Sequence, residues 1–369
     1  MSASKVYLAD LRASFKENLP AKVVRRAEMM GLEDIVPKRG LIAVKLHFGE
    51  KGNTAYIRPN FVRQMVERIK SLGAYPFLTD SNTLYAGTRS DSVSHLITAI
   101  ENGFAFSVVN APIIIADGLR GASYSSVRID QEIIKTAYIG TDIVEADGMI
   151  SLAHFKGHEL SGFGGTIKNL GMGCASRRGK MVEHSDLSPR ITRKKCVGCG
   201  ECVEHCSQSA ITLNKGKAEI DKNKCIGCGE CILICSNKAI DVRWNADMVI
   251  FQKKIVEYAL AVLKGKEGKA GFLNFLTQIS PACDCYDHSD APIVPDVGIL
   301  ASTDPIAIDQ ASVDMVNRQK GLDGSSLASQ KEAGGDKFRG LYPSVDWSVQ
   351  LEYGEKIGLG KRDYELIPI

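Results

Sequence analysis

The sequence predicts an α/β fold, a mostly parallel open sheet flanked by helices, into which a small cysteine-rich α+β domain is inserted. Short apolar runs alternate with amphipathic helices, as β–α–β units require. Several of these runs end in ionisable residues, as strands do at the binding edge of a parallel sheet. A duplicated cysteine pattern predicts the insert at 188–244, between a first part of the α/β domain at 1–187 and a second part at 245–369.

The first clear elements form a β–α–β unit, which implies parallel strands. A strand is expected over 41–46, a helix from Pro59 to Gly73, and a second strand over 75–79. Apolar residues of this helix recur on one face, Pro59 suits its first turn and Gly73 its end. A short strand over 5–8 and a helix over 22–30 are expected before this unit.

The later elements continue the alternation of strands and helices. Asp304 is a good helix N-cap and Pro305 a good first helical residue, so a helix should begin there. The tail after about Ser325 is rich in Gly, Ser and charge, and is expected to be surface loop. Helices are also expected over 91–102 and 246–264, and strands over 111–115, 133–139, 148–153, 272–277 and 297–301.

Composition favours a globular chain of two or three domains. Of the 369 residues, 44% are hydrophobic and 24% charged, and a net charge of +3 is too small to favour nucleic acid or an acidic membrane surface as a partner. No apolar run is long enough for a membrane span or resembles a secretory signal, so a cytoplasmic location is expected. Eleven cysteines in such a chain indicate metal binding rather than disulfides.

A cysteine pattern with the spacing C-x-x-C-x-x-C-x-x-x-C occurs twice, 29 residues apart. The first three cysteines of each set share one tight loop, so their thiolates can converge on one iron–sulfur cube, whereas the following helical turn carries the fourth cysteine to the other cube. The pattern therefore predicts two [4Fe–4S] clusters. The first would be held by Cys196, Cys199, Cys202 and Cys235, and the second by Cys225, Cys228, Cys231 and Cys206.

Over residues 194–242 this segment resembles the bacterial-type two-cluster ferredoxins. It departs from them after the fourth cysteine, where Ser207 and Ser236 stand in place of the usual proline. A serine keeps the backbone N–H that proline lacks, so it can add a hydrogen bond near sulfur and shift the reduction potential without removing a ligand. The alternative is two structural zinc sites, which also use C-x-x-C pairs but do not need eight interleaved cysteines.

Ionisable residues at the predicted strand ends indicate a cleft along one edge of the sheet, because ligands bind outside the carboxyl ends of parallel strands. A structural role such as capping is the alternative for any single residue. Among these residues, His154, Lys156 and His158 are the candidates for proton transfer in catalysis. The other residues at these ends are His47, Glu50, Asp80, Asn82, Asp117, Arg120, Cys283, Cys285, Ser302 and Asp304.

A glycine-rich stretch over 162–174 is a candidate anion-binding loop. Its glycines, Gly164 and Gly165 among them, allow backbone N–H groups to approach a ligand, and Thr166 and Lys168 add a hydroxyl and a fixed positive charge. The stretch matches neither the Walker A pattern nor the dinucleotide-binding pattern. The alternative is a tight crossover in which glycine permits close packing.

Five short segments together resemble the DUF362 family of iron–sulfur centre proteins. They are Lys156-Gly-His158, Gly164–Asn169, Gly171–Cys174, Cys283-Asp-Cys285 and Ser302–Asp309. The resemblance extends over roughly residues 40 to 320. It implies an α/β domain with a two-cluster ferredoxin segment, and no dependable substrate.

Three cysteines remain outside the two cluster sets, namely Cys174, Cys283 and Cys285. One hypothesis is a third metal or redox site at the cleft, where soft thiolates would favour zinc or an iron–sulfur cluster. The alternatives are free thiols, one of them a nucleophile, or merely buried small side chains. Further ligands would come from His154, His158, His184 or His288.

The sequence therefore favours a ferredoxin-linked oxidoreductase. Its clusters would relay single electrons between an external donor or acceptor, a ferredoxin or redox enzyme, and an anionic substrate or cofactor in the cleft. A flavin could serve as that acceptor, although no sequence feature demonstrates one. The alternatives are a non-catalytic electron carrier or metal-delivery protein that docks a partner, and a nucleotide-dependent enzyme, for which no phosphate-loop pattern is met.

Overall fold

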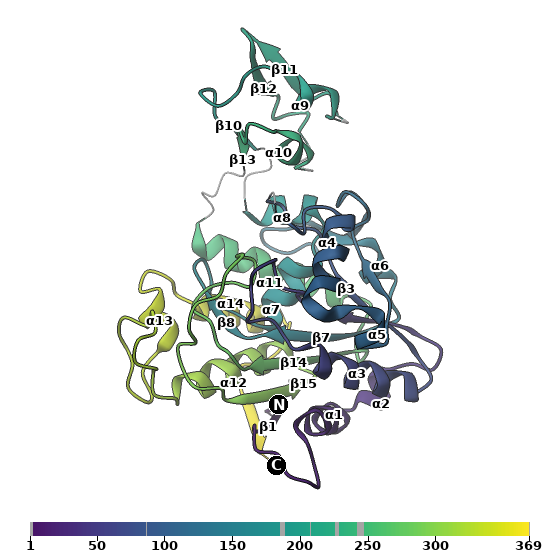
Figure 1. Cartoon of the computed structure of the whole chain (residues 1–369), viewed down its shortest axis with the longest axis vertical. Coiled ribbons are helices and arrows are strands. Elements are labelled where there is room, and N and C mark those ends of the chain that lie inside the picture. The colour runs from purple at the N-terminus through teal and green to yellow at the C-terminus, as the bar shows by residue number, and fades with distance from the viewer. Residues whose placement is uncertain are drawn as a thin grey trace.

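The computed structural model describes residues 3–85, 87–184, 189–206, 208–225, 229–241 and 247–368. Cys228, Ser207 and the expected domain boundaries at Ser188 and Trp244 lie outside the described residues. Figure 1 shows a large α/β body with a small lobe at one end, and the lobe contains the elements between β10 and β13.

The body is built on an eight-stranded sheet with the strand order β16-β1-β15-β14-β7-β2-β3-β4. β15 is antiparallel to both of its neighbours, β1 and β14, and the other neighbouring strands are parallel. The expectation of a mostly parallel α/β sheet is therefore confirmed. The strands are β1 (Ser4–Ala9), β2 (Leu41–Lys45), β3 (Tyr75–Asp80), β4 (Ile113–Ile115), β7 (Gly148–His154), β14 (Ala270–Leu276), β15 (Gly298–Ser302) and β16 (Tyr364–Pro368).

Helices cover both faces of the sheet, and each face has its own apolar core. Successive residues of a strand point to opposite faces. On β2, Ala43 therefore packs in one core, while Ile42 and Val44 pack in the other. The first core contains residues of α7 (Thr166–Cys174), α11 (Met248–Leu263), α12 (Pro305–Asn317) and α14 (Ser348–Lys356), and the second contains residues of α1 (Leu19–Met29), α2 (Leu32–Ile35) and α3 (Pro59–Ser71).

The remaining elements of the body are short. Two small hairpins, of β5 with β6 and of β8 with β9, lie outside the main sheet. In chain order, the short elements of the body are α4 (Ser92–Ala99), a π-helical turn (Ile100–Phe104), α5 (Phe106–Val109), β5 (Tyr124–Arg128), β6 (Thr136–Gly140), α6 (Thr141–Glu145), β8 (Lys156–His158), β9 (Gly162–Gly164), α8 (Arg177–His184) and α13 (Lys337–Leu341).

The predicted start of α12 is confirmed, but the direction of the preceding strand changes its meaning. Asp304 accepts hydrogen bonds from Ile306 N at 2.9 Å and Ala307 N at 3.0 Å, and Pro305 is the first helical residue. Because β15 is antiparallel, Ser302 pairs with Phe272 at the start of β14. Ser302 and Asp304 therefore lie at the sheet edge opposite the carboxyl ends of the parallel strands, and the expectation that they join the cleft is wrong.

Two further expectations are corrected by tertiary packing. The glycine-rich stretch was expected to be a loop, yet α7 occupies most of it. The tail after Ser325 was also expected to be loop, but Phe338 of α13 and Leu351 of α14 are fully buried. β16 then pairs in parallel with β1. Both segments are polar or glycine-rich by composition, and packing against the body supplies what their local propensity lacks.

The small lobe repeats one local structure twice. α9 (Glu201–Glu204) follows Gly200, with φ of 90°, and α10 (Glu230–Ile234) follows Gly229, with φ of 71°. These left-handed positions favour glycine, and they turn each cysteine loop into its helix. The lobe's strands are β10 (Arg190–Ile191) with β13 (Ile240–Asp241), and β11 (Ile211–Asn214) with β12 (Lys217–Ile220).

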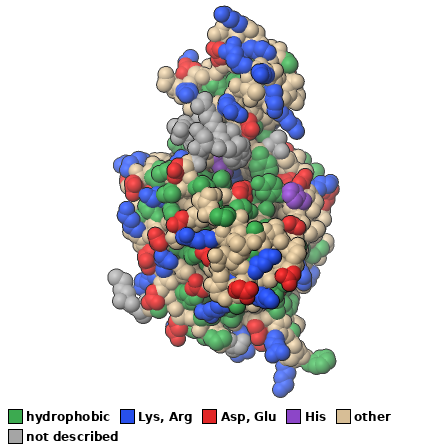
Figure 2. Space-filling model, turned by 90° about the vertical axis from the view of Figure 1, so that its left-hand side faces the viewer, with side chains coloured by type: hydrophobic (Ala, Val, Ile, Leu, Met, Phe, Trp, Pro, Cys, Tyr) green, Lys and Arg blue, Asp and Glu red, His purple; other side chains and the backbone are tan. Residues whose placement is uncertain are grey.

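Within the described ranges, no helix combines the length and apolar character needed to cross a membrane. Figure 2 shows Lys and Arg side chains gathered on the small lobe, at the top of that view. The exposed basic residues of the lobe are Arg190, Arg193, Lys194, Lys195, Lys215, Lys222, Lys224 and Lys238.

Candidate functional site

A cleft of about 1500 Å³ opens at the carboxyl ends of β2, β3 and β7. Its lining joins segments far apart in the chain. Lys45 and Asp80 end β2 and β3, Lys168 and Lys180 come from α7 and α8, and Cys285 follows β14. The ionisable residues at the ends of the predicted strands indicated a binding cleft at this same edge of the sheet.

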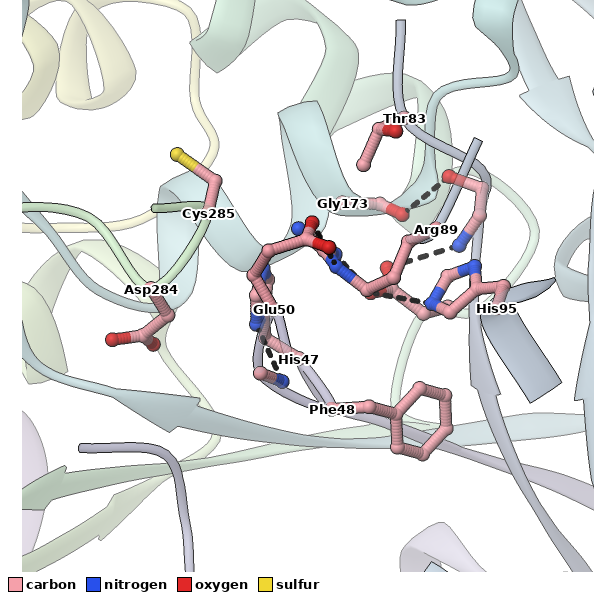
Figure 3. A network of polar contacts seen from close by, with 12 residues as sticks. His47, Phe48, Glu50, Thr83, Arg89, His95, Gly173, Asp284 and Cys285 are labelled. Atoms are coloured by element: carbon pink, nitrogen blue, oxygen red, sulfur yellow. Dashed lines mark hydrogen bonds and ion pairs between the residues drawn. The ribbon is translucent and has the colours of Figure 1, made fainter. Parts of the chain in front are cut away.

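The floor of the cleft is a buried charge network around Asp80. The carboxylate lies 3.1 Å from Lys45 Nζ and 3.6 Å from a guanidinium nitrogen of Arg89. Burial raises the pKa of Asp80, but Lys45, His95 and Arg89 outweigh it and hold that pKa below its usual value. Arg89 also pairs with Glu50 at 3.1 Å, and Figure 3 shows these two side chains pointing toward one another. Two carboxylates thus neutralise two cations, so this network is a charge-balanced floor.

Lys180 supplies the positive charge that the floor does not neutralise. Its Nζ donates to Ala175 O at 2.6 Å and to Ser81 Oγ, and within the described part of the chain it forms no ion pair. Burial lowers the pKa of Lys180, although Asp117 and Asp80 oppose that effect. A buried ammonium without a close carboxylate favours an anionic ligand, because the ligand would restore the charge balance that desolvation makes costly.

One wall of the cleft is organised by Asp284. Its Oδ1 lies 2.8 Å from His154 Nδ1, and its Oδ2 lies 3.0 Å from Lys156 Nζ. The other ring nitrogen of His154 faces Thr277 O at 3.0 Å. Both nitrogens of His154 are therefore engaged inside the protein and the residue does not line the cleft, whereas Lys156 and His158 do. Of the three residues expected to transfer protons, only Lys156 and His158 therefore reach the cleft.

Cys283 lies on the same wall, in surroundings that favour its thiolate form. Its Sγ lies 3.1 Å from Lys168 Nζ and accepts the backbone N–H of Cys285 at 3.4 Å. A hydrogen bond from the Cys285 side chain, opposed by burial, acts together with Lys168 and His158 to lower the pKa of Cys283 well below its usual value. Nδ1 of His158 faces Leu160 N at 3.3 Å and Ser161 Oγ at 2.9 Å, and His158 lines the cleft together with Cys283.

The backbone N–H groups of the glycine-rich stretch bind a carboxylate of the protein itself. Asp309 of α12 accepts Thr166 N–H at 2.8 Å and Ile167 N–H at 2.9 Å, which satisfies the N-terminus of α7. A β-carbon on Gly165 would lie 2.4 Å from the same carboxylate. The expectation that Gly164, Gly165 and Thr166 cradle an external anion is therefore replaced by an internal cap, and Lys168 alone of that set lines the cleft.

The glycines of α7 serve close packing instead. A β-carbon on Gly171 would lie 2.2 Å from Ile255 O of α11, and one on Gly173 would lie 2.5 Å from Lys45 Nζ. A β-carbon on Gly164 would lie 3.0 Å from the stem of Lys168. This geometry agrees with the close-packing alternative, and it lets the lysine side chains reach the cleft past the backbone.

Cys174 does not join Cys283 and Cys285. It is fully buried in the core, and burial raises its pKa to about 12, so it is a neutral thiol. His184 lines the cleft, whereas His288 is exposed outside it. Among the residues that the structure describes, no three or more His, Cys, Asp or Glu side chains form a group that could hold a metal ion.

The lobe cysteines line two separate cavities. Cys196, Cys199, Cys202 and Cys235 border one of about 350 Å³. Cys206, Cys225 and Cys231 border the other, of about 380 Å³, and the fourth cysteine of that predicted set, Cys228, lies outside the described residues. The structure thus brings the fourth cysteine of each repeat to the loop of the other repeat, as the interleaved pattern predicts.

The surroundings of both cavities fit an iron–sulfur cluster. Cys196, Cys199, Cys202, Cys206 and Cys235 form no disulfide bond. Backbone N–H groups point at three of the sulfurs, and such bonds stabilise thiolate ligands and tune a cluster's potential. They run from Ala218 to Cys196 at 3.4 Å, from Ala210 to Cys206 at 3.3 Å and from Ala239 to Cys235 at 3.3 Å.

The second cavity and the cleft share a wall. Leu84 lines the cleft, and it packs in the core of the lobe together with Met181. A β-carbon on Gly229, which lines the second cavity, would lie 2.9 Å from Leu84 Cδ1. Arg177 stabilises the contact between Leu84 and Gly229, because it donates a hydrogen bond to Gly229 O at 2.8 Å and forms an ion pair with Glu230 at 3.3 Å.

Sequence reasoning missed Lys45, Arg89, Lys180 and Leu84. Lys45 carried a usable signal, because a lysine near the end of an otherwise apolar strand needs a buried partner. Arg89 and Leu84 lie in a loop without any motif, and only the tertiary structure brings them to the cleft and to the lobe.

A family model described as "Domain of unknown function (DUF362)" matches residues 42–314. No curated protein matches the chain. Among solved structures, the chain is similar to the lactate racemase apoprotein from Thermoanaerobacterium thermosaccharolyticum, with 14% identity and a TM-score of 0.37 over 74% of this chain and 51% of that one. It is also similar to a Thermotoga maritima protein, with 9% identity and a TM-score of 0.38 over 94% of this chain and 60% of that one. The chain thus spans less than two thirds of the length of either structure.

Proposed function

The chain belongs to the DUF362 family, and from this premise we propose that it is an iron–sulfur oxidoreductase. Two [4Fe–4S] clusters, held by the two cysteine sets, would supply single-electron transfer between an external carrier and an anionic substrate or cofactor in the cleft. The observation that carries the proposal is the shared wall of Leu84 and Gly229, which sets the second cysteine cavity against the cleft.

The external carrier would dock at the outer part of the lobe. Cys199, in the first cysteine set, is exposed, and the neighbouring Lys194 and Lys195 are exposed as well. Basic side chains around an exposed redox centre attract and orient an acidic partner. The first set is then the outer centre, and the second set, next to Leu84, is the inner one.

The cleft residues would bind the anion and move protons. Lys180 lacks an ion-pair partner among the described residues, so its ammonium would attract the ligand's negative charge. Asp80, Lys45 and Arg89 hold the floor rigid beneath it. His158 and Lys156 both line the cleft, which makes them the candidates for proton transfer.

Electron paramagnetic resonance of the anaerobically purified full chain tests the coupling between lobe and cleft. Inorganic phosphate serves as the anion probe, and Cys231→Ser identifies the signals that belong to the second cluster. The proposal predicts that phosphate perturbs the second cluster more than the first. Lys180→Gln should abolish this response, whereas Lys135→Gln, an exposed lysine outside the cleft, should retain it.

The outcomes separate this proposal from a free electron carrier. Equal responses of the two clusters to phosphate, or none, would contradict an inner centre coupled to the cleft. Mass spectrometry of small molecules released from the same preparation gives a second distinction. A co-purifying flavin or other organic anion would support the enzyme, whereas clusters alone with an unresponsive cleft would favour the carrier.

A further inference from the structure

Cys283 and Cys285 form a pair in the turn after β14. The turn closes through Tyr286 N–H to Cys283 O at 3.2 Å, and the Cys285 backbone N–H reaches back to Cys283 Sγ at 3.4 Å. Asp284 between them is held elsewhere by His154 at 2.8 Å, and Figure 3 shows Asp284 and Cys285 pointing apart. Both cysteines therefore line the cleft, while the residue that separates them does not.

The surroundings of the pair suit sulfur chemistry. Thiol–disulfide exchange proceeds through a thiolate, and Lys168 Nζ at 3.1 Å stabilises that form of Cys283. The absence of a side chain at Gly164 leaves room for Lys168 beside Cys283, because a β-carbon at Gly164 would lie 3.0 Å from the Lys168 side chain. Cys283 is 2% exposed, so bulk thiols reach it only through the cleft.

A short run of residues connects the pair to the second cysteine cavity. Tyr85 Oη donates to Cys285 O at 2.9 Å and is itself fixed by Arg89 at 2.7 Å. The adjacent residue, Leu84, packs on Gly229 at that cavity. The two cysteines thus lie at the end of a contiguous path that begins at the inner cysteine set.

We propose that Cys283 and Cys285 are a redox-active dithiol–disulfide couple, and that this couple receives the electrons delivered to the cleft. The inference rests on the proposed function for the source of those electrons. In the reducing step the Cys283–Cys285 S–S bond breaks, two electrons from the external carrier enter, one proton goes to Cys285, and Cys283 remains a thiolate beside Lys168. The oxidising co-reactant is a disulfide of an anionic substrate. Cys283 attacks it, breaking the substrate S–S bond, expelling one substrate thiolate and forming a mixed disulfide. Cys285 then attacks Cys283 Sγ, the Cys283–Cys285 bond forms again, and the Cys285 proton leaves with the second substrate sulfur as a thiol.

The first arm of the test uses the anaerobic full chain in buffers of graded reduced to oxidised dithiothreitol, with alkylation and peptide mass mapping. Wild type should form a Cys283–Cys285 disulfide reversibly, and Cys174→Ser should behave identically. Cys285→Ser should form no such bond. Lys168→Met should slow alkylation of Cys283 at neutral pH about tenfold or more, because the thiolate loses its cation, and Lys168→Arg should restore most of the rate.

The second arm is a reductive titration with methyl viologen radical, starting from the disulfide form. Wild type should consume two more electrons per chain than Cys285→Ser, and Cys231→Ser should lose the rapid return of free thiols. Absence of the disulfide at every buffer ratio, or a metal ion bound to the pair that blocks alkylation, would overturn the couple while leaving cluster function intact. A reversible disulfide in protein without iron or sulfide would instead overturn the proposed function and the assigned electron source.

Discussion

Leu84 packs against Gly229, and this contact joins the cleft of the body to the inner cysteine cavity of the lobe. Leu84 is only 2% exposed, although it lies in a loop. Arg177, fully buried, ties Gly229 O to the body at 2.8 Å. The lobe therefore has a defined inner side, which faces the cleft.

Gly229→Ala should weaken the contact between lobe and body more than Gly200→Ala does. Both glycines hold left-handed backbone at equivalent places in the repeat, with φ of 71° and 90°, so both variants carry similar strain, about 1 kcal/mol. A β-carbon on Gly229 would lie 2.9 Å from Leu84 Cδ1 and 3.2 Å from Arg177 Nη2, whereas one on Gly200 would meet nothing within 4 Å. Thermal unfolding of the anaerobic proteins should show the larger loss for Gly229→Ala, and equal losses would contradict a tight contact.

Asp80→Asn should destabilise the body strongly. It removes the buried carboxylate that lies 3.1 Å from Lys45, and leaves that cation and Arg89 undercompensated. Breaking one partner of such a pair costs about 3–5 kcal/mol. The matched control is Glu67→Gln, which breaks an exposed pair with Arg63 and should cost less than about 0.5 kcal/mol. Urea unfolding measures the free energy of unfolding of both variants. A similarly small loss of stability in the two would show that the ion pairs of Asp80 do not stabilise the floor of the cleft.

Asp309→Ala should loosen α7 by removing its internal anion. Thr166 and Ile167 would lose their buried acceptor, at a cost of about 1–3 kcal/mol for each buried amide left without a partner. Asp247→Ala, which removes an exposed cap from α11, should cost only about 1 kcal/mol. Amide hydrogen exchange should report faster exchange at the start of α7 in Asp309→Ala. Unchanged exchange there would mean that the carboxylate is not the cap.

Glu183→Gln should flatten the pH dependence of stability. Glu183 is fully buried, and within the described residues neither of its carboxylate oxygens has a hydrogen-bond partner. Burial raises its pKa from 4.5 to about 8, although Lys180 and Lys254 oppose the shift. The folded protein binds this proton more tightly than the unfolded chain, so Glu183 makes stability fall as the pH rises from about 4.5 to about 8.

Urea midpoints across that pH range measure the effect as a difference between variant and wild type. Since glutamine does not ionise, the stability of Glu183→Gln relative to wild type should increase from the acidic to the basic end of the range. Glu132→Gln changes an exposed carboxylate and should follow wild type throughout. A constant difference between Glu183→Gln and wild type would contradict a raised pKa at Glu183.

Local sequence rules sufficed where one residue decides the local structure. Asp304 and Pro305 begin a helix, because capping needs only a side-chain oxygen and a fixed φ. The apolar face of α3 that the periodicity predicts is buried at Phe61 and Ile69. The cysteine spacing also places Cys235 with the first loop and Cys206 with Cys225 and Cys231, and these are the described cysteines that border each cavity.

Long-range relationships were beyond those rules. The direction of β15 depends on its neighbours β1 and β14, and nothing within residues 298–302 encodes it. The glycine-rich stretch was predicted to bind an external anion. It binds a carboxylate instead, and Asp309, 143 residues after Thr166, supplies it. A glycine-rich pattern cannot distinguish an internal carboxylate from an external ligand, because both use the same N–H groups.

Anaerobic iron and acid-labile sulfide analysis, read together with electron paramagnetic resonance of the reduced full chain, tests whether the chain holds two [4Fe–4S] clusters. We expect the iron and sulfide of two four-iron clusters per chain and the spectrum of two interacting spins, with one cluster lost in Cys231→Ser. Protein isolated without oxygen that carries zinc in place of iron, or a single cluster held without the second cysteine set, would contradict it.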